Sequence, residues 1–223
     1  MARNIARDKR EAAYRREQLM DVGFRLFAEH GIDAVSLQSI AADADVGIAT
    51  LYKYYPTKAH LVVAISGRVW GRVWQKADAE SEGFAGFSAY DCIAYYADRI
   101  IRLYQKFPAL LRFSSDDKNY IRREGIDGTQ LSAHLDMLAP LETLFHTAYM
   151  RAVADGSIRT DISERELFTT ASITMLSVAE RYAQGIVWAD NGKSDHTPEL
   201  LHLKEMLLLW CTAGCGGGDD GCR

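Results

Sequence analysis

Apolar residues recur at intervals of three and four along most of this chain, and no stretch shows the strict alternation of a half-buried strand. Met20, Phe24 and Phe27 follow this rule near the start, and Ile93 and Ala97 follow it again in the middle. Residues at this spacing share one face of a helix and bury it against neighbouring helices. The sequence therefore predicts an all-α fold of nine or ten helices.

Capping residues, glycines and prolines set the expected helix boundaries. Ser36 is a good N-cap, and Gly31 suits the left-handed residue that follows a helix. Ser163 and Glu166 form a capping box. The segment 114–128 is polar and has the least helical pattern. The expected helices cover residues 8–30, 37–44, 47–54, 57–80, 88–106, a stretch opened by Pro108, 129–155 with a kink or break at Pro140, 164–189, and 198–213.

The composition is that of a soluble globular protein, with 48% hydrophobic and 25% charged residues. No apolar run approaches the roughly 18 residues of a membrane span, and no secretory signal is visible, so we expect a cytoplasmic protein. The histidines and the four cysteines lack the spacing of metal ligands, which favours reduced thiols over a zinc site. We therefore expect no metal and no cofactor.

Charge is distributed unevenly along the chain. The formal net charge is −4, yet residues 1–16 carry six basic and two acidic side chains. The acidic surplus lies in residues 61–223. A basic N-terminal arm, residues 1–12, on an acidic body fits a DNA-binding head joined to a body that does not touch DNA. The arm contacts phosphates or the minor groove, or it is only a solvated run of charge.

Two short predicted helices, joined by a break at Asp45-Val46, form the candidate functional motif at about residues 36–55. A helix, tight turn and short helix can place the second helix in the major groove of DNA. The arrangement is not specific by itself, because any pair of antiparallel helices can look similar.

The residues in this motif make it specific. From Ser36 the chain reads Ser-Leu-Gln-Ser-Ile-Ala-Ala-Asp-Ala-Asp-Val-Gly-Ile-Ala-Thr-Leu-Tyr-Lys-Tyr-Tyr-Pro-Thr-Lys. It resembles the TetR family of bacterial regulators, whose signature includes Ile-Ala, Thr-Leu-Tyr, an aromatic pair and a lysine at these offsets. The resemblance covers about residues 13–73. Asp45, Gly47 and Ala49 depart from the usual residues, and Asp45 tolerates a turn conformation better than most side chains.

The resemblance implies a role for each DNA-facing position. Ser36, Thr50 and Tyr52 would reach phosphates, and Lys58 would add its charge at the start of the next helix. Gln38 suits adenine, while Ile48 and Ala49 suit thymine methyl groups. Tyr52 could instead be a plain surface tyrosine, and Lys53 could serve backbone or base. The expected DNA-binding residues are Ser36, Gln38, Gly47, Ile48, Ala49, Thr50, Tyr52, Lys53, Tyr54 and Lys58.

The expected organisation is an arm (1–12), a helix-turn-helix head (13–73), a ligand-binding and dimerisation bundle (74–213) and a flexible glycine-rich tail (214–223). Helices 164–189 and 198–213 are rich in small and apolar residues, which suits a homodimer interface but also burial within one subunit. A subset of the bundle's aromatic residues is expected to line an apolar effector pocket. We assign to it Tyr96, Tyr104, Phe113, Phe145, Tyr149 and Tyr182.

The sequence thus predicts a regulator of transcription, a repressor released from a palindromic operator by a partly hydrophobic or aromatic effector. An activator of the same fold is an alternative, since no residue decides between them. A non-specific DNA binder and an all-α ligand-binding protein or enzyme are further alternatives. No acid-base dyad, nucleophile triad or phosphate loop is visible, so no catalytic residue is assigned.

Overall fold

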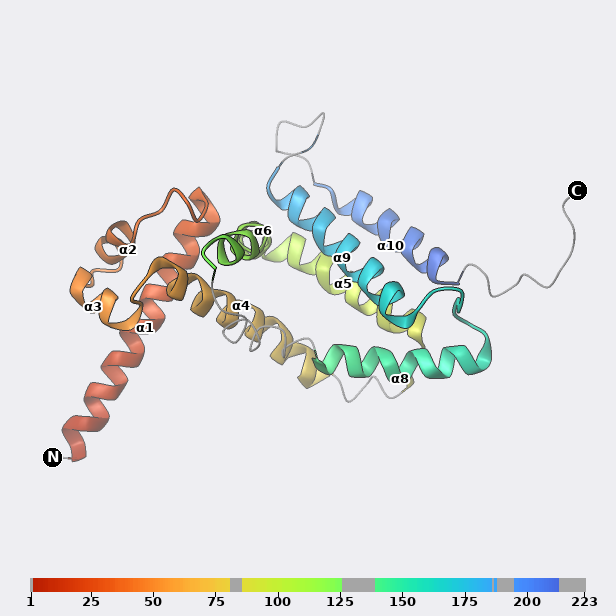
Figure 1. Cartoon of the computed structure of the whole chain (residues 1–223), viewed down its shortest axis with the longest axis horizontal. Coiled ribbons are helices and arrows are strands. Elements are labelled where there is room, and N and C mark those ends of the chain that lie inside the picture. The colour runs from red at the N-terminus through yellow and green to blue at the C-terminus, as the bar shows by residue number, and fades with distance from the viewer. Residues whose placement is uncertain (1, 81–85, 126–138, 186, 188–194, 213–223) are drawn as a thin grey trace, which may run out of the picture. The chain divides into compact units, whose positions relative to one another are not determined.

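The structure is a computed structural model that describes residues 2–80, 86–125, 139–185, 187 and 195–212 (Figure 1). The described residues form nine helices and no strand. The chain divides into two compact units, Met1–Val73 with Arg112–Asp136, and Trp74–Leu111 with Met137–Arg223. The helices are α1 (Ala2–His30), α2 (Leu37–Asp43), α3 (Ile48–Tyr54), α4 (Lys58–Glu80), α5 (Ala89–Lys106), α6 (Pro108–Arg123), α8 (Ala139–Asp155), α9 (Glu164–Ala183) and α10 (Thr197–Thr212).

Local chemistry explains the tight course of the first unit from α1 to α3. Gly31 ends α1 with a left-handed φ of 82°. The side chain of Ser36 then accepts a hydrogen bond from the amide of Ser39 at 3.0 Å and caps α2. Asp45 makes the turn between α2 and α3 with a φ of 50°. The predicted cap, stop and turn are thus confirmed.

The core of the first unit joins α1, α2, α3 and α4 around a few large side chains. Phe27, Ile40, Leu51, Leu61 and Ile65 are almost completely buried. Gly23 permits this packing, because a Cβ atom there would lie 2.9 Å from the Cδ1 of Ile65. The short helices α2 and α3 are therefore fixed by tertiary contacts rather than by their own length.

The second half of α6 belongs to the first unit. Phe113 is fully buried, and its ring lies 5.6 Å from that of Phe24 and 6.4 Å from that of Phe27. The hydroxyl of Ser66 on α4 donates a 2.5 Å hydrogen bond to the carboxylate of Asp117. These contacts add α6 from Arg112 on to the head that the sequence placed within 13–73.

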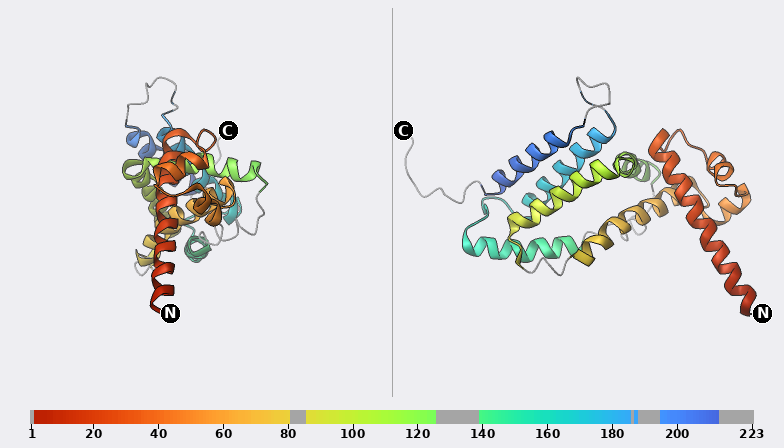
Figure 2. Two further views of the ribbon diagram at one scale, coloured as in Figure 1. Left: turned by 90° about the vertical axis from the view of Figure 1, so that its left-hand side faces the viewer. Right: turned by 180° about the vertical axis from the view of Figure 1, so that it is seen from behind.

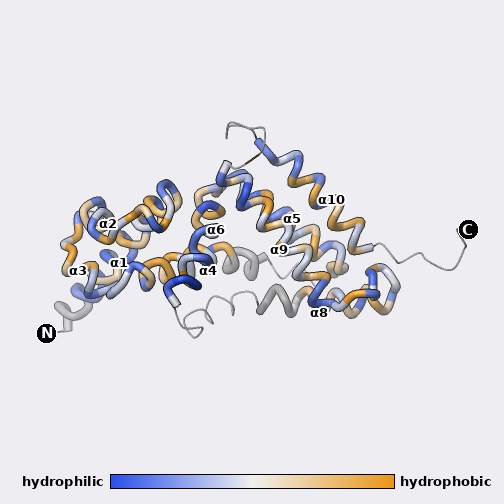
Figure 3. The backbone as a smooth tube through the Cα atoms, turned by 45° about the horizontal axis from the view of Figure 1, so that its top comes forward, coloured by the Kyte–Doolittle hydropathy of each residue, from blue (hydrophilic) through white to orange (hydrophobic). Residues whose placement is uncertain are grey.

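In the second unit, α5 packs against α8, α9 and α10. Figure 3 shows apolar positions recurring along α5, α9 and α10, and the buried ones include Ile100, Leu167, Met175 and Leu200. The expected capping box is present: Ser163 and Glu166 exchange hydrogen bonds of 3.2 and 2.9 Å at the start of α9. Lys204 of α10 pairs with Asp98 of α5 at 2.7 Å.

Three helices differ from the sequence expectation. The first begins at Ala2 rather than near residue 8, and α9 ends at Ala183 rather than near 189. The polar stretch after Ser114 continues α6 to Arg123, because Ser114 and Asp117 turn inward as part of its buried face. The first part of the helix expected over 129–155 lies outside the described residues.

Cys92 and Cys211 are buried, unpaired thiols, and burial raises the pKa of each to about 11. Both therefore stay protonated and unreactive near neutral pH. Cys215 and Cys222 lie outside the described residues. Within the described part of the chain, none of the helices has the length and apolar character needed to cross a membrane.

Candidate nucleic-acid interface

The helix α3 has one buried side and one exposed side. Leu51 is 0% exposed and anchors the helix. Tyr55, the C-cap residue of α3, is also buried. Ile48 and Tyr52 are 37% and 43% exposed although both are large and apolar in part. A seven-residue helix held by one leucine therefore presents most of its remaining surface to solvent.

The predicted contact residues on α3 lie together on this exposed side. Ala49, Tyr52 and Lys53 are exposed beside Ile48, and Thr50 is partly exposed. Gly47 precedes them as the N-cap and makes no side-chain cap bond. The first amides of α3 are thus left without a side-chain acceptor, which suits an anion.

The start of α2 supplies a second group of predicted residues. Ser36 and Gln38 are exposed in its first turn. The hydroxyl of Ser36 already caps the helix, so any phosphate contact would be shared with the Ser39 amide. Ser39 is also exposed and its hydroxyl donates to the Ser36 carbonyl at 2.8 Å. The sequence analysis did not assign Ser39 to the DNA-binding residues. Only its position in the first turn of α2, beside Gln38, indicates that it could belong to them.

Tyr54 and Lys58 are predicted DNA-binding residues that contact other side chains of the first unit. The guanidinium of Arg16 lies 5.0 Å from the centre of the Tyr54 ring, which is half-buried. The Nζ of Lys58 donates to the Asp33 carbonyl at 3.2 Å and lies 5.5 Å from the Tyr120 ring. Burial lowers the pKa of Lys58, and the carboxylates of Asp33 and Glu124 act against that shift.

The predicted effector-pocket residues do not form one group. Phe145 contacts Tyr149 and Phe168, with ring centres 6.0 and 4.8 Å away, and Phe168 contacts Tyr96 at 6.4 Å. Burial raises the pKa of the Tyr96 hydroxyl. These four residues form one aromatic cluster between α5, α8 and α9. Phe168 was absent from the predicted set, because its spacing in the sequence does not show which side it faces.

The other predicted aromatic residues lie elsewhere. Tyr104 and Tyr182 meet at 6.4 Å, and Tyr182 stacks on His196 at 4.4 Å, further along α5. Phe113 belongs to the first unit, where its ring packs against Phe24 of α1.

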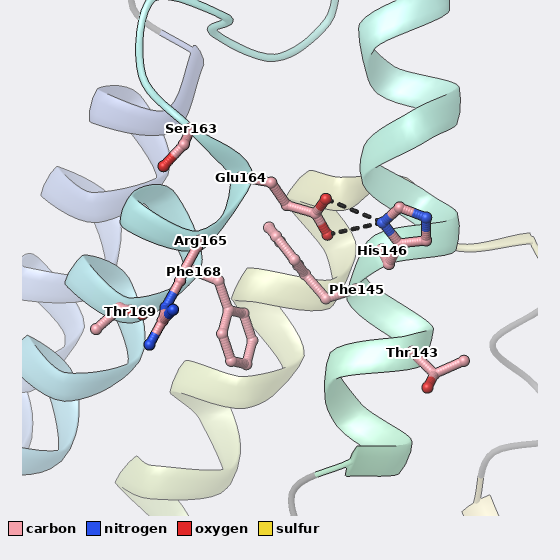
Figure 4. A pocket seen from close by; sticks show the side chains of 8 residues that line it. All are labelled: Thr143, Phe145, His146, Ser163, Glu164, Arg165, Phe168 and Thr169. Atoms are coloured by element: carbon pink, nitrogen blue, oxygen red, sulfur yellow. Dashed lines mark hydrogen bonds and ion pairs between the residues drawn. The ribbon is translucent and has the colours of Figure 1, made fainter.

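A cavity of about 800 Å³ lies at the aromatic cluster (Figure 4). Phe145 and Phe168 supply its apolar part, and His146 bonds Glu164 across it at 2.9 Å. A mixed lining of this kind suits a ligand with an apolar body and a polar end. The lining residues are Thr143, Phe145, His146, Ser163, Glu164, Arg165, Phe168 and Thr169.

Comparison with known proteins identifies the head. Residues 19–65 match the family described as "Bacterial regulatory proteins, tetR family". The match covers the second half of α1, all of α2 and α3, and the start of α4, so it concerns the head of the chain.

Curated TetR-family relatives include repressors. The chain is 26% identical over 142 residues to the HTH-type transcriptional repressor KstR of Mycobacterium tuberculosis, covering 64% of this chain and 60% of that protein. It is 32% identical over 96 residues to KstR of Mycolicibacterium smegmatis, covering 43% and 46%. The alignments therefore span about half the length of these relatives.

Solved structures extend the likeness of fold beyond the TetR-type head. A regulatory protein of the tetR family from Rhodococcus RHA1 superposes with a TM-score of 0.66 at 17% identity, over 88% of this chain and 96% of that one. The regulator FadR of Bacillus subtilis, solved in complex with stearoyl-CoA, gives 0.63 at 15% identity, over 87% and 98%. At these identities the likeness concerns the fold alone.

Proposed function

We propose that this protein is a sequence-specific DNA-binding regulator of transcription, a repressor that a small molecule releases from a palindromic operator. The observation that carries the proposal is α3, whose buried Leu51 leaves Ile48, Thr50 and Tyr52 on the solvent side. Its curated relatives are named repressors, which favours repression over activation. The DNA-binding residues are those assigned from the sequence, and the protein acts in the cytoplasm.

The first test compares a positioning residue with a base-reading residue. Tyr52→Phe removes one phosphate hydrogen bond, so operator affinity should fall by about tenfold for every sequence, equivalent to roughly 1.4 kcal/mol. Gln38→Ala should instead lose discrimination at one base pair, by about 1–3 kcal/mol. Binding to a panel of single-base operator variants, after the operator has been selected from random duplexes, measures both effects.

Both residues are exposed, so the folded state should survive either change. Lys53→Ala is a suitable companion. Loss of its phosphate contact lowers the salt dependence by about one ion per subunit, or about two per dimer, whereas Tyr52→Phe removes no charge. If Gln38→Ala weakened all operator variants equally, its role as a base reader would be refuted.

Homodimerisation through α9 and α10 is part of the proposal. One short recognition helix discriminates poorly, and two heads spaced to match half-sites about 34–36 Å apart double the contacts. Exposed apolar side chains on both helices, Ile173 on α9 with Met206 and Leu209 on α10, support this interface. Exposed large apolar side chains are frequent at interaction sites.

The effector binds in the cavity beside Phe145 and Phe168. The helix α6 transmits the effect of effector binding to the DNA-binding head. Residues of α6 belong to both units. In the head, the carboxylate of Asp117 accepts a hydrogen bond from Ser66 of α4. Arg112 donates a hydrogen bond to the Ala28 carbonyl of α1 at 3.1 Å. A shift of α6 would therefore act on α1 and α4. The effector must bind the released state more tightly than the DNA-bound state.

Anilinonaphthalene sulfonate, an aromatic probe with a charged end, tests the cavity directly. We expect saturable binding that Phe168→Ala weakens by about tenfold, because the phenyl ring contributes about 1.5–3 kcal/mol of apolar contact. Phe107→Ala is the matched control, since Phe107 is an exposed ring in the same unit and lies outside the cavity lining. Equal loss in both variants, measured by fluorescence titration, would contradict this site.

A further inference from the structure

The helix α1 is longer than the head needs. It runs from Ala2 to His30, but among its described side chains, from Arg7 on, the first buried one is Leu19. From Arg7 to Glu17 the side chains are exposed apart from the partly covered Ala12. In Figures 1 and 2 this first half of α1 extends past α2 and α3. We call residues 2–16 the α1 extension.

The charges of the α1 extension oppose the formation of a free helix. The first turn of α1 contains no acidic residue. The sequence instead places Arg3 in this first turn, where the helix dipole is already positive. A helical segment without buried contacts is marginal in water, so this pattern lowers its stability further. Both problems disappear if the extension meets an anion.

The basic side chains lie on two different faces. On one face Glu11 pairs with Arg7 at 3.2 Å and with Arg15 at 3.8 Å. Asp8 lies three residues before Glu11, so it shares this side of the helix. Cations and acids therefore balance on this first face.

Within residues 7–16 the second face carries cations and no acid, and Glu17, which follows on the same side, is already paired with Arg68 and Arg72 of α4. Arg16 points to α3, where it lies over the Tyr54 ring. Lys9 lies seven residues earlier, and seven residues return a helix to within about 20° of the same direction. Arg10 is next to it, and no ion pair among the described residues includes Lys9 or Arg10. The small side chain of Ala13 leaves room for close approach between Arg10 and Arg16.

We infer that the Lys9–Arg10 face of the α1 extension is a second DNA-binding surface, which binds backbone phosphates next to the base pairs that α3 reads. The inference rests on the proposed function, since it requires α3 to dock on DNA. At 1.5 Å per residue the extension is about 20 Å long, equal to roughly six base pairs at 3.4 Å each. Its charge complements the phosphates of a duplex, and Arg16 joins the surface to the recognition helix.

A matched pair of double variants tests this surface in the full-length protein. Lys9→Gln with Arg10→Gln removes the two cations of the second face, and Arg7→Gln with Arg15→Gln removes those paired with Glu11. The first variant should bind the selected operator about tenfold more weakly at low salt and release about two fewer ions per subunit, or about four per dimer. The second should change the salt slope by well under one ion. Phosphate ethylation interference should lose signals only outside the bases that α3 contacts.

The outcomes separate this inference from the proposed function. The Lys9/Arg10 variant could keep the wild-type salt slope and ethylation pattern while Tyr52→Phe weakens binding. That result would refute the second DNA-binding surface but leave the proposed function intact. Equal effects of the two double variants would also refute it, since binding would then follow net charge rather than one face. Failure of the wild-type protein to prefer any duplex would remove both proposals.

Discussion

Replacing Met206 and Leu209 with glutamate is expected to leave the protein monomeric and to weaken operator binding by about 100-fold or more. These side chains lie one turn apart on α10 and are 65% and 70% exposed in the single chain. In the proposed dimer they become buried, and a buried glutamate without a partner opposes association. A monomer then binds one half-site, and the gain from the linked second head is lost.

The control for this prediction is another exposed apolar pair in the same unit. Met150 and Val153 lie three residues apart on α8, and both are exposed. Changing both to glutamate adds the same charge, so a general effect of charge would appear in either variant. Sedimentation equilibrium and operator titration measure the two results. A Met206/Leu209 variant that stays dimeric, or a Met150/Val153 variant that dissociates, would place the interface elsewhere.

The head could be predicted closely because its boundaries depend on local chemistry. Ser36 caps a helix with its own side chain, Asp45 accepts a positive φ, and Pro56 interrupts the chain after α3. Each effect acts within a few residues and is therefore visible in the sequence. The same holds for the Ser163 capping box at the start of α9.

The course of α6 depends on a contact that sequence reasoning cannot see. Ser114 and Asp117 look like loop residues because they are polar, yet both are fully buried on one face of a helix. The hydrogen-bond partner of Asp117 is Ser66, 51 residues away in the chain. Phe113 was assigned to an effector pocket for a similar reason: its aromatic character indicates burial but does not say against which helix.

The start of α1 shows the opposite limit. Residues 7–18 bury almost nothing, so the apolar pattern used to predict helices is absent there. Arginine, glutamate and alanine favour helix, and pairs such as Arg7–Glu11 add a little stability. Because no apolar stripe marks these residues, the predicted helix began only at residue 8. The extra turns, residues 2–7, precede Lys9 and Arg10, which the prediction had already placed in the helix.

Within α3, two truncations of similar size are expected to have different effects. Leu51→Ala should destabilise the head by about 2–5 kcal/mol, because it opens a cavity where the side chain is 0% exposed. Ile48→Ala, one turn away, should change stability by no more than about 0.5 kcal/mol, since the residue is 37% exposed. Its effect should appear instead as a loss of about 1 kcal/mol in preference for thymine at one operator position.

Urea unfolding and binding to single-base operator variants measure the two effects separately. Leu51→Ala should weaken binding to every operator alike, because a poorly anchored α3 loses its orientation on the head. If the effects were exchanged, with Ile48→Ala destabilising the fold and Leu51→Ala altering base preference, α3 would have to face the DNA through its other side. Such a result would also contradict the assignments of Thr50 and Tyr52, because both follow from the same burial of Leu51.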